Sequence, residues 1–533
     1  MSAQGTRQLT PGLFRTPIAA RFLALTGWRA DVAAGLLGAL SAAALPPLHA
    51  IPVLWLAIPG LLVLIGTAAG PRAAARRGFF FGLGHHILGL YWITEAILIE
   101  SARYWWLVPF AVPALAAVLA VFIAAPCAMA RWVPAGWQRW LMLASAWTLF
   151  DLARQYVGTG FPWNPWGSVW AIPGPAGDVM IQPAAWIGTP GLTWVTLLLA
   201  AAPLGGRRAM AGAAAVLAAW AGLGLYRLAE PEPAGLGLQA VLVQGNVSQG
   251  QKWDRTTAVA AFRRYLDLTH TAVAALGGAP SVVIWPETSS VFLLQSDPVA
   301  RKLIMEAAAP ARAALIGSLT FTAGAPSADP DNLPRNSLVA MTPDAAVAGL
   351  YDKWHLVPFG EYAPSWVPFS IQVVPGRFAF GRGPITLHVP GLPAFGPMIC
   401  YEAIFPAQVV DQADRPDWLV NITNDAWFGN SAGPRQHLAA ARLRAVEEGL
   451  PLMRAANTGI TAGFDSRGRE LGRLAMGMAG TLTLPLPGPR PRTSFSRWGL
   501  VVPGLLATAG AGIAMGVTRR RPGTPAIKQG HSQ

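Results

Sequence analysis

Apolar residues run almost uninterrupted through the first part of the chain and return once near its end. A helix that spans a membrane needs about 20 mostly apolar residues. Eight runs approach or reach that length, at residues 31–47, 51–69, 78–98, 105–130, 140–153, 183–204, 209–226 and 498–517. The pattern predicts a polytopic α-helical membrane domain of about eight spans, seven of them within residues 1–232 and the eighth within residues 496–518.

The segment between the last two runs has a different pattern. It follows a linker punctuated by proline, residues 230–233. Short apolar and β-branched runs alternate there with longer amphipathic stretches, which is typical of an α/β domain. The expected strands cover residues 238–244, 281–285, 313–321, 337–341, 396–400, 418–422 and 459–464, and the expected helices cover residues 256–276 and 436–448. We therefore expect a separate α/β domain over residues 237–487.

The composition agrees with a membrane protein. Of the 533 residues, 53% are hydrophobic, only 12% are charged and 22 are tryptophan. The net charge of +14 could indicate a nucleic-acid partner. The arginines, however, lie between the apolar runs and do not form one basic face, so we expect no binding of nucleic acid.

Basic residues also predict how the chain is oriented, because Lys and Arg near the ends of spans stay on the cytoplasmic side. They precede the first run and follow the second, fourth, sixth and eighth runs. These residues are Arg7, Arg15, Arg21, Arg29, Arg72, Arg76, Arg77, Arg131, Arg139, Arg207, Arg208, Arg519, Arg520 and Arg521. With eight spans, all of them lie on one side. Both termini are then cytoplasmic, and the α/β domain is extracytoplasmic.

Three expected strand ends in this domain carry reactive side chains. Glu287 follows the second strand, Lys353 lies among aromatic and apolar residues, and Cys400 ends the strand at 396–400. The only other cysteine, Cys127, lies inside an apolar run, so Cys400 has no obvious disulfide partner. An unpaired thiol at a strand end is a candidate nucleophile.

A thiol, a carboxylate that takes its proton and a lysine that holds an oxyanion are the groups that acyl transfer through a thioester uses. Ligands in α/β folds gather beyond the strand ends, which favours a shared site. Each residue also has a purely structural interpretation. Cys400 could be a small buried side chain, Glu287 could cap a helix, and Lys353 could form an ion pair with Asp352.

Four motifs resemble a known family. They are Trp-Pro-Glu at 285–287, Lys-Trp-His-Leu-Val-Pro-Phe-Gly-Glu-Tyr at 353–362, Ile-Cys-Tyr-Glu at 399–402 and Asn-Asp-Ala-Trp-Phe-Gly at 424–429. Together they resemble the nitrilase superfamily with its Glu-Lys-Cys triad. The eight apolar runs, residues 243–254 and residues 421–461 make nearly the whole chain similar to the apolipoprotein N-acyltransferases of Gram-negative bacteria. This resemblance implies that the α/β domain is an αββα sandwich.

The resemblance also implies roles for individual residues. Cys400 would be the nucleophile, Glu287 the general base and Lys353 the cation that stabilises the oxyanion. The supporting residues implied in the same way are Glu361, Glu402, Tyr401, Trp253 and Asn336. Arg335 precedes Asn336 where the family commonly has an aromatic residue, which leaves the packing around Asn336 open.

The function implied is transfer of an acyl chain from a phospholipid to the N-terminal α-amine of a diacylglyceryl-cysteine apolipoprotein, through a cysteine thioester. No cofactor and no metal are expected, since the eight histidines are scattered. The expected location is the bacterial inner membrane, with a periplasmic catalytic domain. Two alternatives are a membrane-tethered amidohydrolase of the nitrilase type, and a transporter or receptor whose external domain binds a ligand.

Three ionisable residues in the run at 78–98 have two interpretations. His85, His86 and Glu95 could mark a path for protons or ions, because ionisable groups are costly in lipid and are often functional. They could equally face neighbouring helices or lie near the membrane interface. The sequence does not decide between the two.

Overall fold

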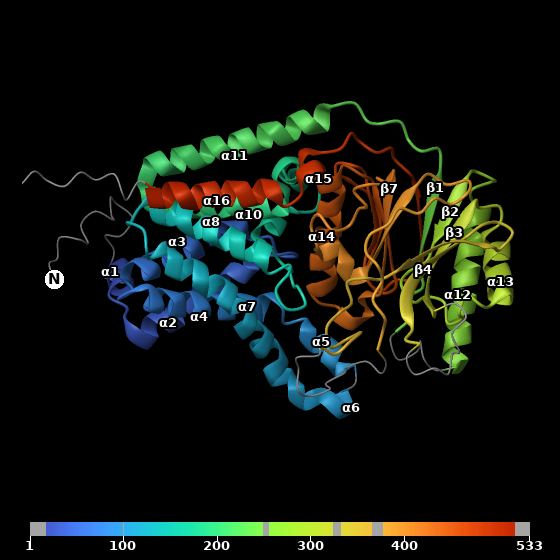
Figure 1. Cartoon of the computed structure of the whole chain (residues 1–533), viewed down its shortest axis with the longest axis horizontal. Coiled ribbons are helices and arrows are strands. Elements are labelled where there is room, and N and C mark those ends of the chain that lie inside the picture. The colour runs from blue at the N-terminus through green and yellow to red at the C-terminus, as the bar shows by residue number, and fades with distance from the viewer. Residues whose placement is uncertain (1–16, 100, 249–254, 323–331, 365–376, 517–533) are drawn as a thin grey trace, which may run out of the picture.

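The computed structural model describes residues 17–99, 101–248, 255–322, 332–364 and 377–516. These residues form a helical part and an α/β part, and the α/β part lies at one end of the long helices (Figure 1). The chain enters the α/β part after helix α11 and returns to the helical part through α15 and α16.

Each of the eight apolar runs contains a helix. They are α2 (Gly27–Ser41), α3 (Leu54–Thr67), α4 (Pro71–Gly89), α7 (Val108–Ala130), α8 (Trp137–Ala153), α10 (Ala184–Ala201), α11 (Gly206–Ala229) and α16 (Val501–Gly516). Shorter helices are α1 (Pro17–Leu23), α5 (Ile93–Leu98), α6 (Ser101–Tyr104), α9 (Pro175–Met180) and α15 (Ser494–Trp498).

The run at 78–98 does not form one continuous helix. Helix α4 begins earlier, at Pro71, where proline fits the first turn because its missing N–H needs no partner there. It ends at Gly89, and α5 follows as a separate short helix. Between them Trp92 leaves the bundle and packs against the α/β part, where its indole N–H donates to Gln436. A tertiary contact is therefore made at the point where this mainly apolar run divides into two helices.

Two stretches among the described residues are long and apolar enough to cross a membrane, residues Ser101–Ala130 and Ala184–Ala229. The most apolar part of each is mainly unburied, with 28% and 17% of its residues buried. A core helix of a soluble protein would instead be covered on most sides. The helical part thus presents apolar side chains outwards, as a lipid-facing surface does.

The α/β part consists of two sheets packed face to face. One sheet has the order β11-β1-β2-β3-β4-β5 and the other β10-β9-β8-β7-β6. The first contains β1 (Gln239–Gln244), β2 (Ser281–Ile284), β3 (Ala313–Thr320), β4 (Arg335–Met341), β5 (Val347–Asp352) and β11 (Gly480–Pro485). The second contains β6 (Phe395–Ile399), β7 (Trp418–Thr423), β8 (Leu452–Ala456), β9 (Thr461–Phe464) and β10 (Glu470–Leu474).

Helices cover the outer face of each sheet. Helices α12 (Arg255–Ala274) and α13 (Pro298–Ala308) pack on the first sheet, and α14 (Gly433–Glu448) packs on the second. A third apolar cluster fills the space between the sheets, with Leu242 and Leu315 from one sheet and Val420 from the other. The expected αββα sandwich is confirmed.

Every expected strand is present, and so are both expected helices. Strands β5, β8, β10 and β11 and helix α13 are additional. The parallel pairs β1–β2 and β2–β3 lie inside the first sheet, whereas β6–β7 and β7–β8 lie toward one end of the second sheet, with β6 as its edge strand. Parallel strands end at the same edge of their sheet, so the residues that follow β6 and β7 are neighbours. The packing of the two sheets then brings Glu287, after β2, to the backbone of Asn424, after β7.

Helix α14 joins the two parts of the molecule. Its Gln436 side chain is buried and accepts hydrogen bonds from the indole N–H groups of Trp92 (3.0 Å) and Trp163 (2.8 Å). Its amide nitrogen donates to the carbonyl oxygens of Pro46 (3.2 Å) and Gly89 (3.3 Å). All four hydrogen-bonding positions of this amide are therefore used by the helical part.

We predict that Gln436→Met destabilises the protein. Methionine has a similar length but leaves two indole N–H groups and two carbonyl groups buried without this partner, at a cost of about 2–4 kcal/mol. Thermal unfolding in detergent should show a lower midpoint for this variant. Gln412→Met, at an exposed position where only a surface hydrogen bond from Arg492 is lost, is the control and should lower the midpoint much less. Equal midpoints for the two variants would contradict the role of Gln436.

Candidate active site

Cys400 lies at a sharp turn where strand β6 gives way to the short helix η7 (Cys400–Ile404). Its φ angle is +50°, in the left-handed region that side chains other than glycine rarely adopt. Such a conformation costs about 1–3 kcal/mol and persists only where the surroundings impose it. The residue is 5% exposed and its thiol is free. A nucleophile on a strained strand-to-helix turn is a recurring arrangement in enzymes, because the turn projects the reactive atom from the sheet.

Glu287, Lys353 and Glu361 form a charged cluster beside this turn, in which Glu287 and Lys353 are buried and Glu361 is partly buried. The ammonium Nζ of Lys353 lies 3.0 Å from Glu287 Oε1 and 3.0 Å from Glu361 Oε1. Lys353 follows β5 and its side chain is fully buried. One ammonium thus bridges two carboxylates that come from different loops of the first sheet.

Asn336, from β4, connects the same two carboxylates. Its Nδ2 donates to Glu287 Oε1 (2.6 Å) and to Glu361 Oε1 (3.0 Å). The neighbouring Arg335 turns away and pairs with Asp352, with 3.5 Å between Nε and Oδ2. Arg335 stands where the resembled family commonly has an aromatic residue, and Asn336 still contacts both carboxylates.

Glu287 is also held from the second sheet. The backbone N–H of Asn424, which follows β7, donates to Glu287 Oε2 at 2.7 Å. The two oxygens of Glu287 therefore have different partners, Oε1 the ammonium and the amide of the first sheet, and Oε2 the backbone of the second.

The electrostatics keep these groups in defined protonation states. Burial alone would lower the pKa of Lys353, but Glu287 and Glu361 outweigh it and raise that pKa well above its usual value. Burial would raise the pKa of Glu287, but Lys353 and the hydrogen bonds bring it below its usual value. Burial and then Glu287 raise the pKa of the Cys400 thiol, while Lys353 lowers it in part. At neutral pH the site therefore holds an ammonium, a carboxylate and a neutral thiol.

Glu402 stabilises the turn at Cys400 through three hydrogen bonds. Its carboxylate accepts from the backbone N–H groups of Ile399 (2.6 Å) and Trp354 (2.7 Å) and from the hydroxyl of Tyr351 (2.8 Å). The residue before Cys400 and the residue after Lys353 are thereby bound to one side chain. Burial raises the pKa of Glu402 to about 7, and the three donors oppose that rise by favouring the carboxylate.

Tyr401 points toward the helical part. Its hydroxyl donates to the carbonyl oxygen of Gly160 at 2.8 Å, and its ring stacks near that of Phe161. The segment at 160–166 therefore lies directly against the residue that follows Cys400. The remaining predicted site residue, Trp253, lies outside the described residues.

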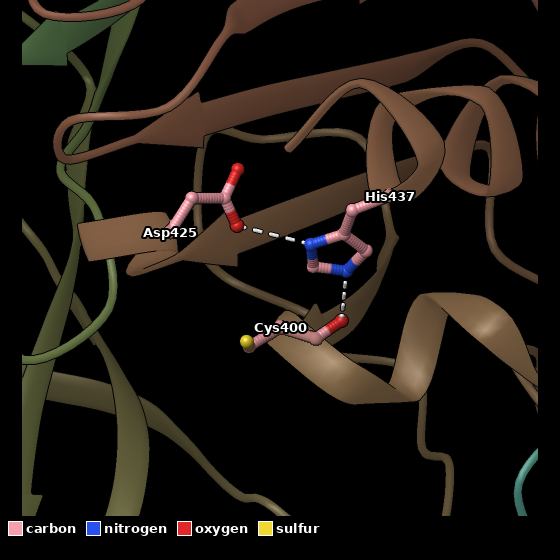
Figure 2. Close-up of side chains that lie close together, drawn as sticks. All are labelled: Cys400, Asp425 and His437. Carbon is pink, nitrogen blue, oxygen red and sulfur yellow. Dashed lines mark hydrogen bonds and ion pairs between the residues drawn. The ribbon is translucent and has the colours of Figure 1, made fainter. Parts of the chain in front are cut away.

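Sequence reasoning missed a second buried group behind Cys400 (Figure 2). His437, on α14, lies 3.0 Å from Asp425 Oδ1 through Nδ1 and 2.9 Å from the carbonyl oxygen of Cys400 through Nε2. Arg454, on β8, donates to Asp425 Oδ2 at 2.7 Å. Asp425 belongs to the Asn-Asp-Ala-Trp-Phe-Gly motif, which was a signal for it. His437 lies in a stretch whose pattern predicted a helix and nothing more, and Arg454 lies in a stretch for which no strand was predicted.

Cys400, Asp425 and His437 are also a conceivable metal-binding set, with ligand atoms all within 4.8 Å of one another. The donors do not favour that use. Both ring nitrogens of His437 are engaged by hydrogen-bonding partners, and the guanidinium of Arg454 already neutralises Asp425. A dication would meet that positive charge, so the three residues fit a hydrogen-bonded support better than a metal centre.

The ionisable residues of the run at 78–98 have different surroundings. His85 is buried, with Nδ1 3.0 Å from Ser41 Oγ and its ring 4.6 Å from that of Trp166. Together with His86 it lines a cavity of about 10 Å³ inside the helical part. Glu95 is half-buried, and its carboxylate lies against Gly429 of the α/β part. The two histidines thus face neighbouring helices, and Glu95 lies where the two parts meet.

Comparison with known proteins agrees with this architecture. Residues 37–202 match the apolipoprotein N-acyltransferase N-terminal domain, and residues 240–483 match the carbon-nitrogen hydrolase family. An amidase from Nesterenkonia sp. of known structure is 19% identical, covers 48% of this chain and 93% of its own, and has a TM-score of 0.34.

Curated relatives match over nearly the whole length. The apolipoprotein N-acyltransferase of Allorhizobium ampelinum is 37% identical over 87% of this chain and 91% of its own. That of Rhodopseudomonas palustris is 37% identical over 90% and 94%, and that of Bradyrhizobium diazoefficiens is 36% identical over 95% and 98%. The chain belongs to the apolipoprotein N-acyltransferase family, and it is an acyltransferase with a fold of the nitrilase superfamily.

Proposed function

We propose that this acyltransferase moves an acyl chain from a phospholipid to the N-terminal α-amine of a diacylglyceryl-cysteine apolipoprotein, with Cys400 as the carrier. The observation that carries the proposal is the buried ammonium of Lys353 between Glu287 and Glu361, close enough to Cys400 to shift the pKa of its thiol. The names of the relatives support the same acceptor. The three catalytic groups are Glu287, Lys353 and Cys400.

In the first half-reaction Glu287 accepts the proton of the Cys400 thiol as the sulfur attacks the ester carbonyl of the phospholipid. The oxygen of the tetrahedral intermediate carries a negative charge. Lys353 and the backbone N–H of Tyr401 stabilise it, and one such donor is worth about 3–4 kcal/mol. The intermediate then breaks the carbon–oxygen ester bond. Glu287 returns the proton to the departing oxygen, so a lysophospholipid leaves and a thioester remains.

In the second half-reaction the neutral α-amine of the apolipoprotein attacks the thioester carbonyl. The same donors hold the new oxyanion. Glu287 accepts a proton from the nitrogen and passes it to the sulfur as the carbon–sulfur bond breaks. The products are an amide and a free thiol. The burial of Cys400 supports transfer over hydrolysis, because water has poor access to the intermediate.

Glu361 and Asn336 position the catalytic groups in this scheme. Glu361 shares the ammonium of Lys353, and its second oxygen accepts from the N–H of Val357 at 2.8 Å. Asn336 donates to both carboxylates, and each of them has an oxygen 3.0 Å from the Lys353 ammonium. Glu402 and Tyr401 hold the two sides of the nucleophile turn, and Trp253 stays a predicted supporting residue near the site.

We also propose that the eight long helices span the inner membrane. Helix α11 runs toward the α/β part and α16 runs away from it (Figure 1), so Arg207 and Arg208 lie at the opposite end of the bundle. That basic end would be cytoplasmic and the α/β part periplasmic. Exposed aromatic residues at the ends of the helices, such as Trp132 and Trp498, support this placement.

The domain limits follow from the same proposal. Residues 1–232 would form the membrane domain with seven spans, residues 237–487 the catalytic domain and residues 496–518 the eighth span. Both substrates are lipids, so a catalytic domain seated on the ends of the spans receives them from the adjacent leaflet. A membrane-tethered amidohydrolase remains the alternative, and it differs only in giving the acyl group to water.

We predict a covalent acyl adduct on Cys400 when the purified chain is incubated with phospholipid. Intact-protein mass spectrometry should show the mass of one acyl chain, and Cys400→Ala should abolish it because no other residue carries the thioester. Cys127→Ala, at the other buried cysteine, is the matched control and should acylate normally.

The second substrate then separates the two enzyme functions. A synthetic diacylglyceryl-cysteine peptide should remove the adduct and gain the acyl mass, whereas buffer alone should remove it slowly. Rapid loss of the adduct in buffer, with no acylated peptide formed, would favour the amidohydrolase. An adduct that persists in Cys400→Ala would overturn both.

We predict that Tyr351→Phe changes the pH dependence of thioester formation. The supporting carboxylate Glu402 has a pKa raised to about 7 and loses its charge as the pH falls through that value. The Tyr351 hydroxyl lowers this pKa, so its removal moves the acid limb of the rate to higher pH. Glu287 does not set this limb, because its pKa lies below its usual value.

The measurement is the rate of adduct formation across the neutral range. Tyr226→Phe, at an exposed position on α11, is the control and should follow the wild-type profile. Coincident profiles for Tyr351→Phe and wild type would show that the ionisation of Glu402 does not govern the first half-reaction.

A further inference from the structure

The peptide group between Cys400 and Tyr401 is hydrogen-bonded to a side chain of helix α14. The carbonyl oxygen of Cys400 lies 2.9 Å from His437 Nε2. A carbonyl oxygen only accepts, so Nε2 carries the hydrogen and donates it. Figure 2 shows the sulfur of Cys400 on the far side of the residue from this oxygen. The imidazole thus contacts the backbone of the nucleophile and leaves its thiol free for chemistry.

His437 is itself rigidly supported. Its Nδ1 lies 3.0 Å from Asp425 Oδ1 and 3.2 Å from Arg454 Nη2. Asp425 also accepts from the hydroxyl of Thr423 at 2.9 Å. The side chains of His437, Asp425 and Arg454 are completely buried. Such a network has little freedom to move, so it can impose an orientation on the group that it touches.

The neighbouring residue ties this support to the helical part. Gln436 uses all of its hydrogen-bonding positions on Trp92, Trp163 and two carbonyl groups of the helical part. The ring of Trp163 also lies 5.7 Å from the ring of His437. The start of α14 is therefore fixed against the helical part at the residue next to His437.

A planar trans peptide points its C=O and N–H in opposite directions. A donor that holds the Cys400 carbonyl therefore also sets the direction of the Tyr401 N–H. We propose that His437 is a positioning residue for acyl transfer, which aims the Tyr401 N–H at the developing oxyanion and maintains the left-handed backbone of Cys400. This inference rests on the proposed function, because it concerns the oxyanion of that reaction.

Two substitutions separate positioning from packing. In His437→Gln the side-chain amide nitrogen can reach the place of Nε2, whereas in His437→Asn it reaches only the place of Nδ1. We expect His437→Asn to slow adduct formation at saturating phospholipid by roughly 100-fold, as a small misplacement of a reacting group does. The phospholipid concentration that gives half the maximal rate should stay unchanged. His437→Gln should recover most of the rate.

His270→Asn, at an exposed position on α12, is the matched control and should keep the wild-type rate. A wild-type rate in His437→Asn would overturn the inference while wild-type acylation continues to support the proposed function. Equal losses in the Asn and Gln variants would also overturn it, because they would indicate a packing role. A wild-type chain that forms no adduct would instead refute the proposed function, and the inference with it.

The sequence allows a direct test that needs no variant. Of the two cysteines only Cys400 precedes a tyrosine, so carbonyl-¹³C cysteine with ¹⁵N tyrosine labels one peptide group in the full-length chain. With ¹⁵N-labelled histidine in addition, NMR in lipid bilayers should detect a close dipolar contact between the labelled carbonyl and a protonated histidine Nε2. The absence of that contact would overturn the inference, even if the Asn variant failed to fold.

Discussion

The ammonium of Lys353, buried between Glu287 and Glu361, is the interaction on which the rest of the site depends. A buried charge is tolerated only when it is paired, and removal of one partner leaves the other charge exposed to the full cost of burial. Here two carboxylates flank one ammonium, and both ion pairs lie beside the neutral thiol of Cys400.

The two sheets contribute different halves of this site. The first sheet supplies Glu287 and Lys353, and the second supplies Cys400 and the backbone N–H that holds Glu287. The site therefore exists only when the sheets are packed together. Helix α14 connects the second sheet to the helical part. One of its faces packs on that sheet, and its first turn is hydrogen-bonded to the helical part. The turn at Cys400 is thus supported by both parts of the molecule.

Strands β8 and β11 of the α/β part are two of those that were not predicted from the sequence. Strand β8 was missed because it carries Arg454, and an arginine in a short apolar stretch argues against a central strand. Its burial is possible only because Asp425 and Asn421 come from other elements to bind it. Strand β11 was also missed, although its threonine and leucine residues alternate, and it pairs with β1, far away in the chain.

The sequence by itself determined the apolar helices, the alternation of strands and helices in the α/β domain and the identity of the residues at the strand ends, because these depend on local periodicity and on motifs with fixed spacing. Glu287, Lys353 and Cys400 could be named in this way. Only the tertiary structure decided that Lys353 bridges two carboxylates, that Gln436 joins the two parts and that His437 holds the carbonyl of Cys400. Each of these contacts joins residues distant in the chain or on different elements, and long-range packing leaves no periodic signal in the sequence.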